Sequence, residues 1–508
     1  MGDSSTDLGE YLKISRTVDE QKLKKLGLVR ELGIDPYPHL FRPTIHGDEL
    51  LSRYGDLKTE EHRENEIHSV AGRLMFRRKM GKASFYDLYD ESGRIQVYLQ
   101  ELELTELERA LLPNLDLGDF LGVTGFVFRT KTGEVSVHCK ALKLLAKSIA
   151  PMPEKFHGLS DLELRYRQRF IDMTMQPAVR DVFRKRSFIV NEIRNYLIAR
   201  GFTEVETPIL QPIYGGASAK PFVTHHNALD SDLFLRISPE LYLKRLVAGG
   251  FEKVFDIAKN FRNEGCDATH NPEFTMIEWY EAYTDYNYQM DQVEDMVESI
   301  VRKLQGGGTK VQFGDQEIDY RRPWRRITMW DGLRQYAGVE PETITREEVV
   351  RELARYKDRI EPQKSRGELL AELFEETCEK HLIAPTFVID HPVEISPLTK
   401  KHRDPSKKGL VERFELFIAQ KEVSNCYSEL NDPVDQGLRL YEQEQHRVFD
   451  EEAQPMDRNF IHCVEFAMPP MGGVGVGIDR LVMLLTNQQT IRDVIAFPIM
   501  KLRDEDLF

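Results

Sequence analysis

Near the carboxyl end, residues 459–487 read "NFIHCVEFAMPPMGGVGVGIDRLVMLLTN". We interpret this stretch as a strand, a Gly-rich turn and a helix. Glycines at 472, 473, 475 and 477 would let a ligand approach the backbone closely, and Arg480 stands where the helix begins. The stretch lacks the GK[ST] of a P-loop, and its late position argues against a dinucleotide fingerprint. It predicts either a phosphate contact or a plain structural turn.

A second candidate cation stands in a separate segment, "FRNEGCDATHNPEF" at 261–274. Arg262 offers a planar fork that suits phosphate or carboxylate. Glu264 can accept from an amino group, and Phe274 can lie against a flat ring. An antiparallel hairpin with a surface ion pair would explain the same residues.

A third segment, "KEVSNCYSELND" at 421–432, contains two glutamates of interest. Glu422 and Glu429 are seven residues apart, which puts them on opposite faces of a regular strand. A bulge or turn could bring both to one ligand. Beside phosphates they would suit Mg²⁺, which prefers a few carboxylates plus phosphate oxygens. The alternative is a pair of unrelated surface glutamates.

Length and composition indicate a globular protein of two or three domains. The chain has 508 residues, of which 41% are apolar and 30% charged. No apolar run approaches the roughly eighteen residues of a membrane helix, and the amino terminus lacks a signal or transit pattern. Five widely spaced cysteines without a CxxC pair suit a reducing compartment, which we expect to be the cytoplasm. A net charge of −15 argues against bulk nucleic-acid binding, although a local basic surface could still bind phosphates.

The order of elements indicates two different domains. Residues 10–32 predict a helix, and from about Ile67 five strand-like runs follow, with a helical piece, "TELERALL", among them. Five short strands in this span favour an OB-fold. "APMPE" at 150–154 predicts a linker before a longer α+β region. Its first helix, over 181–201, ends at Gly201, and Pro208 interrupts the strand that follows.

Together these segments resemble a known family. The helix and strand reaching Pro208, "FRNE" at 261–264 and "GVGVGIDR" at 473–480 resemble, in order, the three motifs of class II aminoacyl-tRNA synthetases. Within the aspartyl, asparaginyl and lysyl subgroup the lysyl members are most similar, through "GGASAKPF" (215–222), "RISPELYLK" (236–244) and "HNPEFTMIEWYEAY" (270–283). "DHPVEISPL" (390–398) and "FELFIAQKEVSNCYSELNDP" (414–433) extend the match, which covers roughly residues 10–500.

The resemblance implies an α+β fold with two main domains. An N-terminal helical segment would occupy 1–66, an OB-fold β-barrel 67–148 and a linker 149–160. A class II catalytic domain, an antiparallel sheet flanked by helices, would occupy 161–508. The family further implies a homodimer formed through 181–212 and no membrane association.

The implied reaction is the ATP-dependent attachment of L-lysine to tRNA(Lys) through a lysyl-adenylate. The catalytic residues would be Arg262, on the α-phosphate and the amino-acid carboxylate, and Arg480, on the γ-phosphate. Phe274 would stack on adenine. Other ATP contacts would be Glu264, His270, Asn271, Glu422, Val423 and Gly477, and Mg²⁺ would bind Glu422 and Glu429.

The family also implies an amino-acid pocket. Several carboxylates suit a dibasic substrate, because a buried ammonium needs a partner, and they would repel aspartate. Leu243 stands where aspartyl enzymes carry a Lys that pairs with the substrate carboxylate. These features favour lysine over aspartate or asparagine. Glu240, with Gly215 and Gly216, would hold the α-ammonium, Glu278, Tyr280 and Glu429 would surround the side-chain end, and Asn425 and Tyr427 would frame the substrate.

The barrel would read the anticodon. Phe85, Gln96 and Glu134 resemble the family's anticodon contacts, with Phe85 stacked on the central uridine and Gln96 hydrogen-bonded to it. A core position is the alternative for Phe85. Residues 71–100 hold six basic against three acidic residues, so the local charge suits RNA. A tRNA-binding protein without catalysis is the remaining alternative, although such relatives usually lose the motif arginines.

Overall fold

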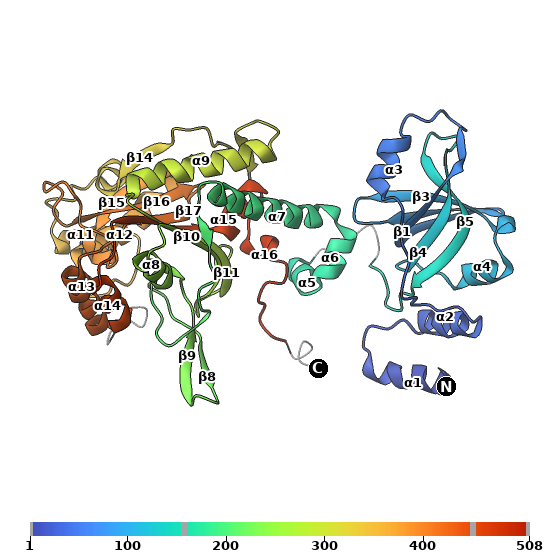
Figure 1. The fold of residues 1–508 in the computed structure, drawn as a ribbon, viewed down its shortest axis with the longest axis horizontal. Coiled ribbons are helices and arrows are strands. Elements are labelled where there is room, and N and C mark those ends of the chain that lie inside the picture. The colour runs from blue at the N-terminus through green and yellow to red at the C-terminus, as the bar shows by residue number, and fades with distance from the viewer. Residues whose placement is uncertain (1–3, 154–160, 448–453, 504–508) are drawn as a thin grey trace. The chain divides into compact units, whose positions relative to one another are not determined.

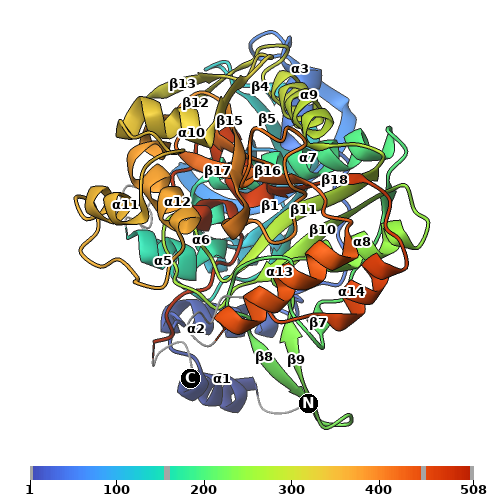
Figure 2. The ribbon, with the colours of Figure 1, turned by 90° about the vertical axis from the view of Figure 1, so that its left-hand side faces the viewer.

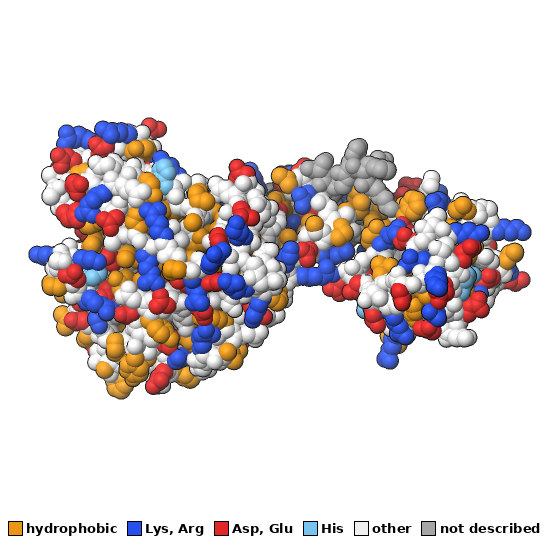
Figure 3. All heavy atoms as spheres, turned by 90° about the horizontal axis from the view of Figure 1, so that it is seen from above, with side chains coloured by type: hydrophobic (Ala, Val, Ile, Leu, Met, Phe, Trp, Pro, Cys, Tyr) orange, Lys and Arg blue, Asp and Glu red, His pale blue; other side chains and the backbone are white. Residues whose placement is uncertain are grey.

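The computed structural model describes residues 4–153, 161–447 and 454–503 (Figure 1). The chain divides into two compact units, residues 1–158 and 159–508, and each has its own apolar core. Of the predicted linker at 149–160, residues 154–160 lie outside the described part. No helix in the described ranges has the length and apolar character needed to cross a bilayer. On the face in Figure 3, basic and acidic side chains are interspersed, so the negative net charge forms no single patch there.

The smaller unit is a closed barrel with strand order β1-β2-β3-β5-β4, which confirms the predicted barrel. Alternate residues fill it: Tyr86 and Leu88 of β2 and Val97 and Leu99 of β3 are buried in one cluster. The strands are β1 (His62–Met80), β2 (Ala83–Tyr89), β3 (Arg94–Gln100), β4 (Phe120–Arg129) and β5 (Val135–Ala146).

Helices surround this barrel, and one prediction about them was wrong. The expected helix over 10–32 is two helices, α1 (Ser4–Ile14) and α2 (Glu20–Glu31), because Asp19 caps the second by accepting from the backbone of Gln21 and Lys22. The predicted helical piece between strands is α4 (Glu106–Leu111), which begins with a capping box of Thr105 and Glu108. The remaining helix is α3 (Gly47–Tyr54).

The larger unit is built on an eight-stranded sheet in the order β14-β15-β16-β17-β18-β11-β10-β6. Its strands pair antiparallel except at the two edges, where β14 and β6 run parallel to their neighbours. The predicted class of fold is therefore confirmed. The strands are β6 (Thr203–Glu204), β10 (Lys253–Phe261), β11 (Glu273–Ala282), β14 (Arg325–Thr328), β15 (Thr386–Pro392), β16 (Leu410–Ile418), β17 (Lys421–Ser428) and β18 (Met471–Gly477).

Three helices cover one face of this sheet: α7 (Pro177–Ile198), α9 (Tyr286–Leu304) and α15 (Ile478–Leu485). Val182, Ile189, Ile193 and Leu197 form the buried stripe of α7 and pack in the same cluster as the sheet. The helix predicted over 181–201 therefore exists but begins and ends earlier, and Gly201 follows it with φ of 83°.

Residues 459–487 fold differently from the prediction. Its first part is α14 (Arg458–Glu465), not a strand, and its glycines form β18 rather than a turn. A Cβ at Gly473 would collide with Tyr280 and Glu429, so only glycine fits this strand position. Helix α15 follows directly, as predicted.

Smaller elements complete the unit. The chain around Pro208 forms β6 and, in another sheet, β7 (Leu210–Gln211), which confirms the predicted interruption. The hairpin of β8 (Val223–His226) and β9 (Ser231–Leu235) projects from the unit (Figures 1 and 2). The others are α5 (Leu162–Arg167), α6 (Arg169–Met175), α8 (Glu240–Ala248), β12 (Lys310–Phe313), β13 (Gln316–Asp319), α10 (Met329–Gly332), α11 (Arg346–Leu353), α12 (Arg366–Thr377), α13 (Pro433–His446) and α16 (Ile491–Val494).

Candidate functional site

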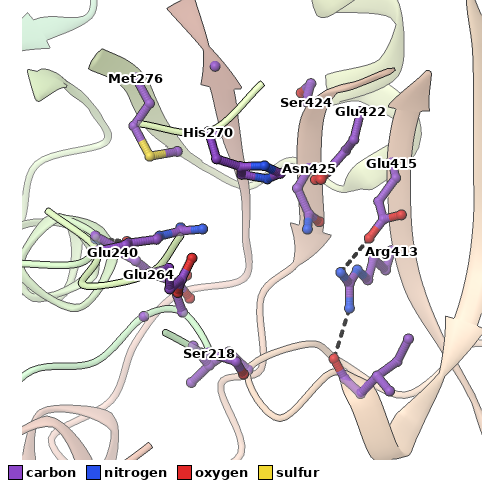
Figure 4. Close-up of a pocket in the computed structure, with 18 of the residues that line it drawn as sticks. Ser218, Glu240, Glu264, His270, Met276, Arg413, Glu415, Glu422, Ser424 and Asn425 are labelled. Atoms are coloured by element: carbon purple, nitrogen blue, oxygen red, sulfur yellow. Dashed lines mark hydrogen bonds and ion pairs between the residues drawn. The ribbon is translucent and has the colours of Figure 1, made fainter. Parts of the chain in front are cut away.

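A pocket of about 800 Å³ in the larger unit gathers most of the predicted site residues. Figure 4 shows Glu240 and Glu264 on one side of it and Arg413, Glu422 and Asn425 on the other. Gly215 and Glu429 are the two predicted catalytic-unit residues that do not line it. Those that do are Gly216, Glu240, Arg262, Glu264, His270, Asn271, Phe274, Glu278, Tyr280, Glu422, Val423, Asn425, Tyr427, Gly477 and Arg480.

Arg262 and Phe274 share one wall of the pocket because they flank a hairpin. Strands β10 and β11 pair antiparallel, with Asn260 opposite Phe274, and the backbone N–H of Arg262 donates to Pro272 O at 2.8 Å. The guanidinium of Arg262 lies 5.1 Å from the ring centroid of Phe274. The sequence left open whether this segment is a surface hairpin or part of a binding site. The hairpin is present, and both side chains line the pocket.

Arg480 also lines the pocket, at the start of α15. Its Nη1 donates to Glu422 O at 2.8 Å, and its Nη2 lies 3.0 Å from His270 Nε2. Asp267 holds the other ring nitrogen of His270, with Oδ2 2.8 Å from Nδ1. Two permanent cations, Arg262 and Arg480, thus border one cavity, which suits a ligand with several negative charges.

Buried polar atoms without a partner mark the pocket as a binding site. Among the described residues, no group hydrogen-bonds to Arg262 Nε, Asn271 Oδ1, Ser424 Oγ or Asn425 Oδ1. All four residues line the pocket. Unpaired buried polar atoms are costly, so their gathering here indicates that a ligand supplies the missing partners.

Carboxylates are concentrated at the end of the pocket near α8. Ser238 Oγ donates to Glu278 Oε1 at 2.8 Å, and Tyr280 O–H donates to Glu278 Oε2 at 3.1 Å. Burial, and then the negative charge of Glu240, raise the pKa of Glu278 to about 8. Gly216, with φ of 84°, borders this end and donates its N–H to Gln454 Oε1 at 3.2 Å. A ligand with ammonium groups would balance the negative charge of these carboxylates.

Lys244 is the residue that sequence reasoning missed. It is fully buried, and its Nζ lies 2.5 Å from Glu240 Oε1 and 2.5 Å from Glu429 Oε2. Its neighbour Leu243, on which the sequence comparison rested, packs instead in an apolar cluster with Phe460. The available signal was the i,i+4 spacing of Glu240 and Lys244 on one helix.

Glu422 and Glu429 do not meet at one point of the pocket lining. A bulge in β17 opposite Leu416 and Phe417 lets Glu422 line the pocket, whereas Glu429 lies behind Gly473 against Lys244. Burial and then the neighbouring Glu415 raise the pKa of Glu422. This carboxylate fits a divalent cation that takes its other ligands from phosphates. Within the described ranges, no group of three or more His, Cys, Asp or Glu could hold a metal by itself.

Arg413 is a further pocket cation that the sequence analysis did not name. It donates to Ile395 O at 2.8 Å, to Ser396 Oγ at 3.0 Å and to Glu415 Oε1 at 2.6 Å (Figure 4). Charged residues inside the otherwise apolar strand β16 were the signal that could have found it. Helix α12 and the segment that precedes it also contribute pocket residues that were missed, namely Lys357, Lys364, Glu368, Glu372 and Glu375.

In the smaller unit, two of the three predicted RNA contacts lie on neighbouring strands, Phe85 on β2 and Gln96 on β3. Phe85 pairs with Tyr98, and Gln96 pairs with both Asp87 and Ser136, so these side chains share one face of the barrel. Phe85 is half-buried and outside the core cluster, with its ring 5.1 Å from that of Tyr98. This placement removes the core alternative for Phe85 and leaves an aromatic surface. Glu134, before β5, pairs with Arg94.

Comparison with known proteins agrees with this architecture. Residues 161–501 match the family model described as tRNA synthetases class II (D, K and N), and residues 68–145 match that of the OB-fold nucleic acid binding domain. The lysine–tRNA ligase of Syntrophomonas wolfei is 46% identical over the whole of both chains. That of Methanoculleus marisnigri is 50% identical over 95% of each chain. That of Clostridium novyi is 49% identical over 95% of this chain and 94% of its own.

Proposed function

The chain belongs to the lysine–tRNA ligase family of class II tRNA synthetases, and we propose that its pocket joins L-lysine to the AMP portion of ATP, with release of pyrophosphate, before the lysyl group passes to tRNA. The protein is a ligase that attaches lysine to tRNA(Lys); the relatives favour neither an aspartyl nor an asparaginyl enzyme, nor a protein without catalysis. The observation that carries the proposed site is the meeting of Arg262 and Arg480 with a carboxylate-rich end in one cavity.

The first step is attack of the lysine carboxylate on the α-phosphate of ATP, which releases pyrophosphate and leaves lysyl-adenylate. The nucleophile is already a carboxylate, so no protein base is required. Arg262 would bind the α-phosphate and the substrate carboxylate, Arg480 would bind the γ-phosphate, and Phe274 would cover the adenine. Alignment and charge neutralisation then lower the barrier. Glu264, His270, Asn271, Val423 and Gly477 would complete the ATP site.

The carboxylate-rich end would hold the substrate lysine. Glu240, with Gly216, would bind the α-ammonium, and Glu278 and Tyr280 would face the side-chain ammonium. Glu429 lies beside Gly473 and outside the pocket lining, and it would influence the substrate through its ion pair with Lys244. Gly215, Asn425 and Tyr427 would frame the amino acid.

Glu422 would bind Mg²⁺ together with the phosphates. Glu429, the second metal ligand that the sequence predicts, lies outside the pocket lining and pairs with Lys244, so it does not reach the same ion. When bound, Mg²⁺ neutralises charge on the reacting phosphates. The position of Glu422 supports this role, because the side chain lies beside Arg480 and borders the same cavity.

The second step transfers the lysyl group from lysyl-adenylate to the terminal ribose hydroxyl of tRNA(Lys), forming an ester and releasing AMP. Phe85 would stack on the central anticodon base, and Gln96 and Glu134 would hydrogen-bond to the anticodon. We also propose a cytoplasmic homodimer formed through residues 181–212. Exposed apolar side chains in or beside that segment support it: Phe188, Ile198, Ile209 and Leu210.

ATP–pyrophosphate exchange without tRNA tests the proposal. The wild-type protein should exchange with lysine and show no exchange with aspartate or asparagine. Exchange with aspartate or asparagine instead would contradict the lysine pocket, and the absence of exchange with all three would favour a binding protein. Sedimentation analysis would separately report whether the chain is a dimer.

A further inference from the structure

Arg186, on α7, does not line the pocket. It hydrogen-bonds to three segments that border the proposed ATP site. Its Nη1 donates to Asp479 Oδ1 at 2.5 Å and to Val494 O at 3.2 Å. Its Nη2 donates to Thr275 Oγ1 at 3.1 Å. The guanidinium of Arg186 therefore connects α7 to α15, α16 and β11.

Asp479 shares its carboxylate between two of these elements. Its Oδ2 accepts from the backbone N–H of Thr275 at 2.6 Å, while Oδ1 accepts from Arg186. Thr275 directly follows Phe274, and Asp479 directly precedes Arg480. The same carboxylate thus ties the residue proposed for adenine to the residue proposed for the γ-phosphate.

Burial makes Asp479 dependent on Arg186. Asp479 is 2% exposed, and Arg186 is the cation that pairs with it. A buried carboxylate that loses its counter-charge takes up a proton or turns toward water, and either change loosens its other contacts. The neighbouring cation Lys185 points elsewhere, since it pairs with Asp181 of its own helix at 2.8 Å.

We propose that Arg186 is a positioning residue for ATP, which holds Asp479 so that Phe274 and Arg480 keep the separation that the nucleotide spans. Arg186 touches no substrate and acts through Asp479 and Thr275. Its hydrogen bonds go to residues on the ATP side, so its loss weakens ATP binding and spares lysine binding. The inference rests on the ATP roles proposed above for Phe274 and Arg480.

The test is ATP–pyrophosphate exchange of Arg186→Met, Arg186→Lys and the control Lys185→Met, which removes an equal charge one residue away. In Arg186→Met the KM for ATP should rise roughly tenfold to a hundredfold, because hydrogen bonds to a charged group are lost. The KM for lysine should stay within about twofold. Arg186→Lys should be intermediate, since an ammonium keeps the charge but lacks the fork. Lys185→Met should match the wild type.

Two results would overturn the proposal: an unchanged KM for ATP, or equal rises in both KM values. If Arg186→Met does not fold, as judged by its melting temperature, Arg186→Lys decides by the same comparison. Failure of the wild-type protein to exchange with lysine would contradict the proposed function instead, so the two failures are distinguishable.

Discussion

Lys244 Nζ lies 2.5 Å from Glu429 Oε2 in a cluster that contains no solvent-exposed side chain. Glu240 contacts the same ammonium at 2.5 Å and also lines the pocket. The chain therefore carries an ammonium of its own where we propose that substrate ammonium groups bind. Three carboxyl groups, Glu240, Glu278 and Glu429, share this region with one resident cation, so they can supply negative charge when a dibasic substrate enters.

Replacing Lys244 by Met should weaken lysine binding and destabilise the fold. Loss of one partner from a buried ion pair costs about 3–5 kcal/mol in the free energy of unfolding. Glu240 and Glu429 would take up protons and attract the substrate less. Chemical denaturation and the KM for lysine would measure the two effects. Lys253→Met, which removes a half-exposed cation paired with Glu281, is the control. An unaltered KM for lysine would argue against a role for Lys244 in the pocket.

Lysine affinity should rise with pH up to about 8. The pKa of Glu278 in the free pocket is raised from 4.5 to about 8, so much of this carboxyl is protonated at pH 7. An incoming ammonium favours the charged form, and binding therefore releases protons. Calorimetric titration in two buffers of different ionisation enthalpy would show this release at pH 7. Glu278→Gln should release fewer protons, and equal release from both proteins would contradict the assignment.

The same shift has a consequence for stability without lysine. The folded protein binds more protons at Glu278 than the unfolded chain does between pH 4.5 and about 8. This group therefore stabilises the fold at low pH and loses that contribution as the pH rises through about 8. Glu278→Gln should remove its part of this slope, which chemical denaturation at several pH values would detect.

Phe85→Ala should impair tRNA use and leave amino-acid activation intact. Stacking on one base contributes about 1–3 kcal/mol, so the KM for tRNA(Lys) should rise roughly fivefold to a hundredfold. Phe120→Ala is a matched control, because Phe120 is exposed on the same barrel and contacts Arg73. Kinetics of aminoacylation and of tRNA-free exchange would separate the two steps. A fall in exchange would place Phe85 in the fold rather than on the RNA.

The ATP-facing side of the pocket could be predicted from sequence because its residues are close in the chain. Arg262 and Phe274 flank one hairpin, and Arg480 begins the helix after the Gly-rich strand. The interpretation of 459–465 as a strand failed because a short apolar run does not distinguish strand from helix. The spacing of Glu240 and Lys244 was a local signal for one buried pair. Glu429 as the second partner of Lys244, and Asp479 as the partner of Arg186, are brought to these cations by folding. Such contacts depend on tertiary packing, which no local pattern records.

ATP–pyrophosphate exchange by Glu429→Gln measures whether the buried carboxylates select lysine. The substitution keeps the size of the side chain and removes the charge that Lys244 and the substrate share. Lysine-dependent ATP–pyrophosphate exchange should fall by roughly 10²- to 10³-fold in kcat/KM, because breaking the buried Glu429–Lys244 pair costs about 3–5 kcal/mol and disturbs Glu240, which contacts the same ammonium and lines the pocket. Exchange at the wild-type rate, with an unchanged KM for lysine, would contradict the account.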